Sequence, residues 1–168
     1  WRPSGTAGGS PGADDTGSVP AAGAIVINEV LAHSSVEDYD WIELYNTTDE
    51  DIHIGGWYLS DNNDDDPNRM KYRIADGTII KSHDYAVFYE NLHFANPSDP
   101  GCSAVFRLSE NGETIYLQSG QDGALTGYYE EEDFGASDQD VAFGRHQNST
   151  GTYNFVAMSR NTPGEANA

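Results

Sequence analysis

Residues 40–61 read DWIELYNTTDEDIHIGGWYLSD, and this stretch decides the fold class of the chain. Apolar residues recur at every second position, at Ile42 and Leu44 before a polar turn and over residues 52–54 after it. Such alternation predicts two neighbouring antiparallel strands, each with one face in a core and the other in water. A further alternating pair, Trp57 and Leu59, follows after two glycines, and we expect the large Trp57 ring in the core of a β-sandwich.

The rest of the chain repeats this pattern in short runs separated by turns, and no helical periodicity persists over about 11 residues. The first strand is expected from Ala24, in a run that is apolar on much of both faces. Asn111-Gly112 predicts a hairpin between residues 104–108 and 113–118, and an Asp-Gly turn precedes a strand over residues 124–129. The sequence therefore predicts an all-β sandwich of about nine to ten antiparallel strands.

The 168 residues divide by composition into two parts. Residues 1–23 are rich in Gly, Ser, Pro and Ala, which predicts a disordered linker, and residues 24–168 form one folded domain. The chain begins at Trp1 rather than Met, so we expect a monomeric module of a longer protein. Cys102 is the only cysteine, which excludes a disulfide within the chain, and no apolar run approaches the ~20 residues of a membrane-spanning helix.

The charge balance limits the partners of the protein. Acidic residues outnumber basic ones 28 to 8, which gives a formal net charge of −20. This charge should repel nucleic acid and anionic membranes, so neither is an expected partner. It makes divalent cations plausible partners, although an acidic surface that serves only solubility explains the same composition.

The densest acidic cluster is the candidate calcium site, at Asp61, Asn63, Asp64, Asp65 and Asp66. Alternating side-chain oxygens at Asp61, Asn63 and Asp65 resemble the first half of a calcium-binding loop. The helix–loop–helix pattern fails, because Asp66 stands where the sharp turn needs Gly. Two interpretations remain open, a looser calcium loop and a solvated connection between strands.

Six motifs in this order and spacing resemble the lamin-tail domain. They are INEV at 27–30, WIELYN at 41–46, GWYLSD at 56–61, ADGT at 75–78, VAFGR at 141–145 and TPGEAN at 162–167. The resemblance implies an immunoglobulin-like sandwich, and its last two motifs are similar to the bacterial, extracellular branch of the family. In that branch the domain is appended to surface proteins, nucleases and hydrolases. The strong acidity argues against the chromatin contacts of nuclear relatives.

Surface aromatic residues are the second candidate site. Trp41, Tyr45 and Tyr58 alternate with inward-facing positions and could form one outer face on which sugar rings stack. The alternative is that these rings pack beneath loops of the protein itself.

Catalysis has little support in the sequence. Five histidines are scattered without metal-ligand spacing, no Gly-x-Ser-x-Gly elbow is present, and the lone cysteine has no evident histidine partner. We therefore expect a non-catalytic accessory, adhesion or protein-interaction module of an exported protein, located outside the cell or on its surface. Its expected partner is a protein, a cell surface or a polysaccharide, and the alternative function is a carbohydrate-binding module.

Overall fold

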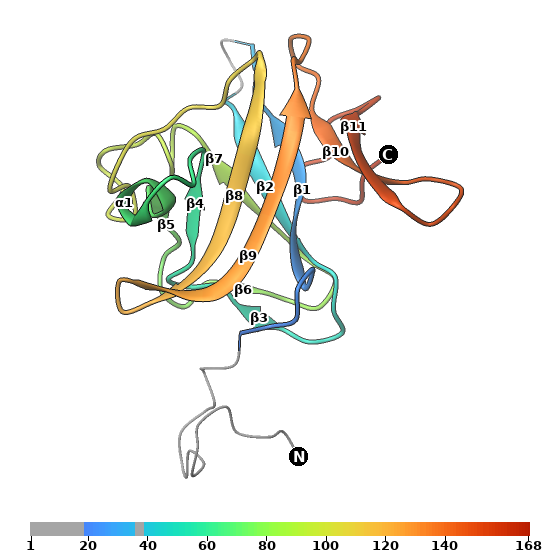
Figure 1. Ribbon diagram of the computed structural model, residues 1–168. Coiled ribbons are helices and arrows are strands. Elements are labelled where there is room, and N and C mark those ends of the chain that lie inside the picture. The colour runs from blue at the N-terminus through green and yellow to red at the C-terminus, as the bar shows by residue number, and fades with distance from the viewer. Residues whose placement is uncertain (1–18, 36–38) are drawn as a thin grey trace.

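The computed structural model describes residues 19–35 and 39–168 (Figure 1), and the predicted linker over residues 1–23 lies mostly outside them. Within the described residues the chain forms eleven strands and one short helix. In chain order these are β1 (Ile25–Leu31), β2 (Trp41–Asn46), β3 (Ile52–His53), β4 (Tyr58–Ser60), α1 (Asp66–Arg69), β5 (Tyr72–Arg73), β6 (Ile79–Ile80), β7 (Tyr85–Tyr89), β8 (Gly112–Gln121), β9 (Ala124–Gly135), β10 (Phe143–Gln147) and β11 (Tyr153–Ala157). None of the described helices is long and apolar enough to cross a membrane.

The strands form two packed sheets, as the sequence predicts. One sheet has five strands in the order β11-β10-β1-β2-β7, and the other has four in the order β5-β4-β8-β9. Every pairing between neighbours is antiparallel, and β3 and β6 make a separate short pair. In Figure 1 the long β8–β9 hairpin lies across the front of β1 and β2. The all-β sandwich is confirmed.

The inward faces are those that the apolar alternation indicates. Ile42 and Leu44 are fully buried, and Trp57 lies in the same core at 5% exposure. The Trp57 ring packs 4.7 Å from the ring of Tyr128 on β9. Tyr128 also joins the two sheets, because its hydroxyl accepts a hydrogen bond from Ile25 N at 2.9 Å and donates one to Ile25 O at 2.6 Å.

The predicted pairing of residues 41–46 with residues 52–54 is wrong. Strand β2 pairs with β1 and β7, whereas β3 pairs only with β6 among the described strands. The chain turns away from the sheet at Asn46, whose side-chain amide donates to the carbonyls of Glu50, Ile80 and Lys81 at 2.7, 3.0 and 3.1 Å. These bonds direct the chain after β2 to the β6 segment.

The predicted Asn-Gly hairpin is also wrong. Residues 104–108 form no strand, because the Phe106 ring stacks on Phe94 at 4.7 Å and holds this segment against the core. The hairpin forms instead at Asp122-Gly123, where both residues have positive φ, 52° and 80°. Two successive positive φ angles give the tight turn that matches strand twist, and glycine adopts this angle without strain.

Two segments contain more secondary structure than the sequence predicts. Residues 130–135 extend β9 beyond the strand predicted over residues 124–129. The loop at residues 60–68 contains the start of α1, capped by the Asp65 side chain, which accepts from Asn68 N. Asp65, Asp66 and Pro67 suit the first turn of a helix.

Candidate functional site

The structure separates the three predicted sugar-binding rings, which is a correction of that prediction. Trp41 is 4% exposed and packs with Leu31 and Ala142 in a second core on the outer side of the five-stranded sheet. Tyr58 is 6% exposed, in the other sheet, and its ring lies directly on Gly120, where a β-carbon would come within 2.4 Å of it. Only Tyr45 remains partly exposed, so these rings form no common stacking face.

The predicted calcium loop directs its oxygens to partners within the chain. Asp61 binds Lys71 Nζ at 2.5 Å, Asp66 pairs with Arg69 at 3.4 Å, and Asp65 caps α1. The other two members act likewise: Asn63 Oδ1 accepts from Gln118 at 3.0 Å, and Asp64 Oδ2 accepts from Asn62 at 3.2 Å. Across residues 19–35 and 39–168, no three His, Cys, Asp or Glu side chains gather in a way that could hold a metal ion. The loop is built as a connection, and the calcium interpretation has no support in its geometry.

The most unusual polar feature is a pair of buried carboxylates that the sequence analysis did not identify. Glu29 on β1 and Glu43 on β2 are opposite each other in the ladder and both are 0% exposed. A bulge at Asn28 lets Ile27 and Val30 both face the main core and turns Glu29 to the other side of the sheet, where Glu43 also lies.

The C-terminal segment covers these carboxylates and binds them. The amide N–H of Thr162 donates to Glu29 Oε1 at 3.0 Å and its hydroxyl to Oε2 at 2.5 Å. The amide N–H of Gly164 donates to Glu43 Oε2 at 2.5 Å, and the Asn28 side chain donates to Oε1 at 2.7 Å. We call Glu29, Glu43 and residues 162–167 the C-terminal clamp.

Asn167 completes the C-terminal clamp. Its side-chain amide donates to Arg145 O at 2.9 Å and to Asn28 O at 3.1 Å, and its Oδ1 accepts from Asn28 at 2.8 Å. The fit is close, because a β-carbon at Gly144 would approach Asn167 Nδ2 and Met158 Sδ to 2.9 Å. The C-terminal end of the chain is therefore part of the packed fold.

Burial controls the ionisation of the C-terminal clamp. The pKa of Glu43 is raised to about 7, chiefly because burial removes solvation; the hydrogen bonds from Gly164 and Asn28 oppose this rise, and the charge of Glu29 adds to it. Burial also raises the pKa of Glu29, against the two hydrogen bonds from Thr162. Two adjacent carboxylates in low dielectric resist double ionisation, so they titrate as a pair.

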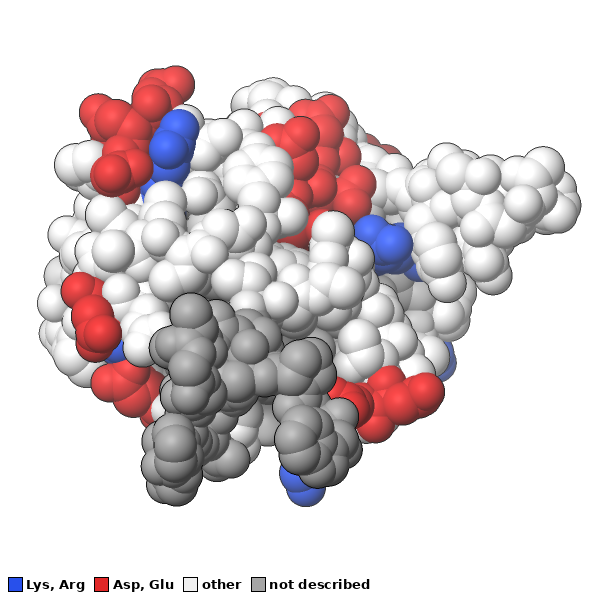
Figure 2. Space-filling model, turned by 60° about the horizontal axis from the view of Figure 1, so that its bottom comes forward, with Lys and Arg blue, Asp and Glu red and all other residues white. Residues whose placement is uncertain are grey.

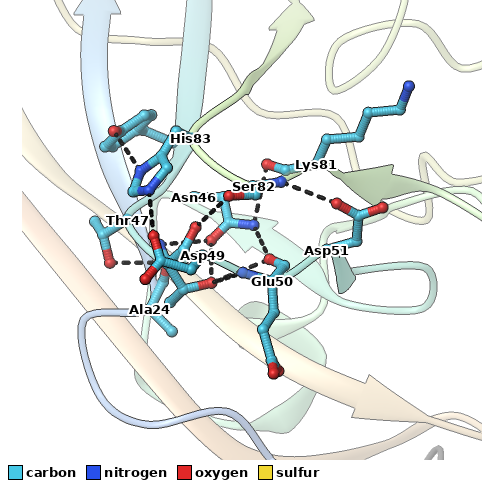
Figure 3. A network of polar contacts seen from close by, with 11 residues as sticks. Ala24, Asn46, Thr47, Asp49, Glu50, Asp51, Lys81, Ser82 and His83 are labelled. Atoms are coloured by element: carbon cyan, nitrogen blue, oxygen red, sulfur yellow. Dashed lines mark hydrogen bonds and ion pairs between the residues drawn. The ribbon is translucent and has the colours of Figure 1, made fainter.

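A second polar network closes the end of β2 (Figure 3). Asn46 is 0% exposed, and its Oδ1 accepts from the backbone and hydroxyl of Thr48 at 2.9 and 2.7 Å. On the same loop, Asp49 lies 2.8 Å from His83 Nε2, and the other ring nitrogen of His83 lies 3.3 Å from the Tyr45 hydroxyl. Thr47 anchors the start of the described chain through its hydroxyl, which donates to Gly23 O at 2.7 Å. The network holds the loop after β2 against residues 80–83 and against Gly23.

A third charged group lies between the sheets beside β9. Arg145 Nη1 on β10 is 3.7 Å from Glu130 and 3.8 Å from Glu132, which face inward between Tyr128 and Phe134. Burial raises the pKa of both glutamates, that of Glu132 to about 7. The positive charge of Arg145 opposes both increases. Figure 2 shows a cluster of carboxylates near the upper centre of its view, with basic atoms to the lower right of it. One arginine against two glutamates leaves this group acidic.

Two surface hollows are lined by the described residues. One hollow of about 310 Å³ has His53 as its single ionisable lining residue. Another of about 370 Å³ contains four ionisable groups, and each has a partner within the chain. His33 lies 3.4 Å from Glu110, Glu90 pairs with Arg107, and Asp40 accepts from a backbone N–H at 2.9 Å.

These observations define the structural class of the protein. Two packed antiparallel sheets, with polar groups that hold loops and the C-terminal end in place, form an immunoglobulin-like module. The chain matches the Lamin Tail Domain family over residues 18–130 and belongs to that family. No curated protein and no solved structure matched the chain. The family match ends within β9, so β10, β11 and residues 162–167 of the C-terminal clamp lie beyond it.

Proposed function

We propose that this chain is a non-catalytic interaction module of an exported, multidomain bacterial protein. It would hold neighbouring domains of that protein and attach them to a protein partner or a cell surface. The C-terminal clamp is the observation that supports this role best. The most deeply buried carboxylates bind the end of their own chain, so they are occupied by a structural task and face no substrate.

The resemblance of residues 141–145 and 162–167 to the bacterial branch of the family supports the exported context. Membership of the Lamin Tail Domain family supports a module that acts through its outer surface. The burial of Trp41 and Tyr58 removes the basis for the alternative carbohydrate-binding face, and no further observation favours it.

A two-part assay of the 168-residue chain tests this proposal. The first part measures turnover of chromogenic ester, glycoside, phosphoester and peptide substrates. The second measures saturable retention on cell-surface protein and on insoluble polysaccharide. We expect no turnover above buffer and retention that is lost on heat unfolding. Turnover that the folded Glu43→Gln variant abolishes would overturn the proposal, as would the absence of saturable retention on every surface.

A further inference from the structure

The β10–β11 hairpin differs in charge from the rest of the molecule. Residues 146–159 contain no Asp, Glu, Lys or Arg, in a chain whose formal net charge is −20. Figure 2 shows the hairpin as an uncharged projection from the body of the molecule. Four of the five residues of β11 are exposed, including Tyr153 at 53% and Val156 at 38%.

Strand β11 is an open edge of the five-stranded sheet, because it pairs only with β10 among the described strands. The positions of its hydrogen bonds follow from the two ends of this ladder. Met158 N donates to Ala142 O at 2.8 Å at one end, and Asn148 N donates to Thr152 O at 2.9 Å at the other. Hydrogen-bonded pairs alternate with non-bonded pairs in an antiparallel ladder, so every second residue between these ends bonds to β10.

This alternation identifies the main-chain groups that point away from the sheet. Asn154 and Val156 bond to β10, and Tyr153, Phe155 and Ala157 direct their N–H and C=O groups to the open side. The same three side chains share one face of the strand. The open edge thus carries three outward donor–acceptor residues whose own side chains are uncharged, two of them aromatic, and β11 has no Pro or charged residue of the kind that protects strand edges. The nearest charge on this face is the Arg145 guanidinium of β10, which lies 4.7 Å from the Tyr153 ring.

The other described edges are less suited to strand pairing with a like chain. Strand β9 carries Glu130–Asp133, which a symmetric pairing would place close to the same carboxylates of the second chain. Strand β7 lies directly between Asp84 and Glu90, and its residues are buried or only partly exposed. Strand β5 has two residues, and Tyr72 already forms a bridge with Cys102.

We propose that β11 pairs antiparallel with β11 of a second copy of this chain, which joins two five-stranded sheets into one. A twofold axis at Phe155 places Phe155 opposite its own copy and Tyr153 opposite Ala157, so that their outward main-chain groups bond to each other. Cross-strand aromatic pairs of this kind are favourable. No carboxylate of residues 146–159 enters the contact, because this segment has none. This inference goes beyond the proposed function and does not depend on it.

The strength and salt dependence of the dimer follow from its size and charge. Pairing of two five-residue strands buries less than the roughly 1,200–2,000 Å² of a standard interface, so the dimer is weak and reversible. Each copy has a charge of −20, and the two copies repel each other at low ionic strength. Salt shortens the screening length to about 3 Å at 1 M, so added salt strengthens the dimer. Salt would weaken a dimer held by ion pairs.

Sedimentation equilibrium of the 168-residue chain from about 10 μM to about 1 mM, at low and high salt, tests the proposal. We expect a monomer–dimer equilibrium that tightens with salt. Val156→Glu adds like charges near the axis and should weaken the dimer at least about tenfold, a loss of about 1.4 kcal/mol, while Val156→Thr leaves it intact.

Ala157→Pro supplies an independent variant, because it removes an outward N–H and leaves the β10 ladder bonded. It should also weaken the dimer, and urea unfolding of each variant monitors the fold. A monomer at the highest concentration in high salt would overturn the proposal. A dimer that weakens with salt would overturn it too, as would one that Val156→Glu and Ala157→Pro leave unchanged.

Discussion

The C-terminal clamp makes stability depend on pH in a way that can be measured. The pKa of Glu43 is about 7 in the folded protein, against 4.5 for an unperturbed glutamate. Between these values the folded state binds more protons than the unfolded state, so the free energy of unfolding falls as the pH rises. The stabilisation is complete below pH 4.5 and is lost as the pH rises through about 7.

The magnitude follows from the same pKa values. Raising a carboxyl pKa from 4.5 to about 7 corresponds to about 3.5 kcal/mol, at about 1.4 kcal/mol per pH unit. Of this, about 2.5 kcal/mol falls between about pH 5 and pH 8.5, because some of the unfolded-state titration occurs below pH 5. For a domain of this size the loss lowers the melting temperature by roughly 5–10 °C.

The Glu43→Gln variant removes one member of the Glu29–Glu43 pair, so its difference from the wild type separates the titration of this pair from that of the other carboxyls. Glutamine has the shape of the protonated acid and does not titrate. Its amide nitrogen cannot accept the hydrogen bond that Gly164 or Asn28 donates to one Glu43 oxygen, so the comparison uses the change in stability with pH and not the stability at a single pH. Urea unfolding at several pH values should show that the wild type loses about 2.5 kcal/mol more than Glu43→Gln between about pH 5 and pH 8.5. Glu132, whose pKa is also raised to about 7, contributes equally to both proteins and cancels in the comparison. Parallel curves for the two proteins would refute the reasoning.

Three further predictions concern single groups. Tyr128→Phe leaves the N–H and C=O of Ile25 without their partner, so it should lower the free energy of unfolding in urea by about 1–3 kcal/mol. The same change at exposed Tyr153 should have no effect. An equal loss of stability in both variants would contradict the role of Tyr128 in joining the two sheets. Thr162→Ala removes a hydrogen bond to the buried Glu29 and should lower the free energy of unfolding by about 1.5–3 kcal/mol. Thr162→Ser keeps the hydroxyl and should keep wild-type stability. A loss of stability in both variants would contradict a stabilising role of the hydroxyl. The melting temperature should differ by less than about 1 °C between excess calcium and a chelator, because the oxygens of residues 61–66 already have partners; a rise of several degrees in calcium would show a site that this geometry does not explain.

Local periodicity predicted which residues are buried better than it predicted which strands pair. Ile42, Leu44 and Trp57 face the core because alternation in a strand fixes the face of each side chain. The partner of β2 was not predictable in this way, because contacts distant in the sequence select it. Asn46 binds the carbonyl of Ile80, which directs the following strand to the β6 segment.

A favourable turn sequence was not sufficient to predict a hairpin. Asn111-Gly112 and Asp122-Gly123 both suit a hairpin, and only the second forms one. The difference arises outside the turn, because the Phe94–Phe106 stack holds the segment before Asn111 out of any sheet.

The C-terminal clamp was not predicted from the sequence for a related reason. A charged residue in a strand is usually exposed, so the sequence analysis did not predict that Glu29 and Glu43 are buried. Their burial comes from the covering C-terminal segment, whose Thr162 is 133 positions from Glu29. The pattern that could have indicated the pair was a glutamate within each of two otherwise apolar strands. Trp41 is buried for a similar reason, because Leu31 and the distant residue Ala142 pack against it.

Amide hydrogen exchange at Thr162 and Gly164 tests the central claim most directly, that the C-terminal segment is an integral part of the sandwich. Their N–H groups bind the buried Glu29 and Glu43, so their exchange should be slowed to an extent similar to that of Ile25–Leu31 in β1. Exchange of both amides at the rate of an unstructured peptide, with β1 still protected, would contradict it.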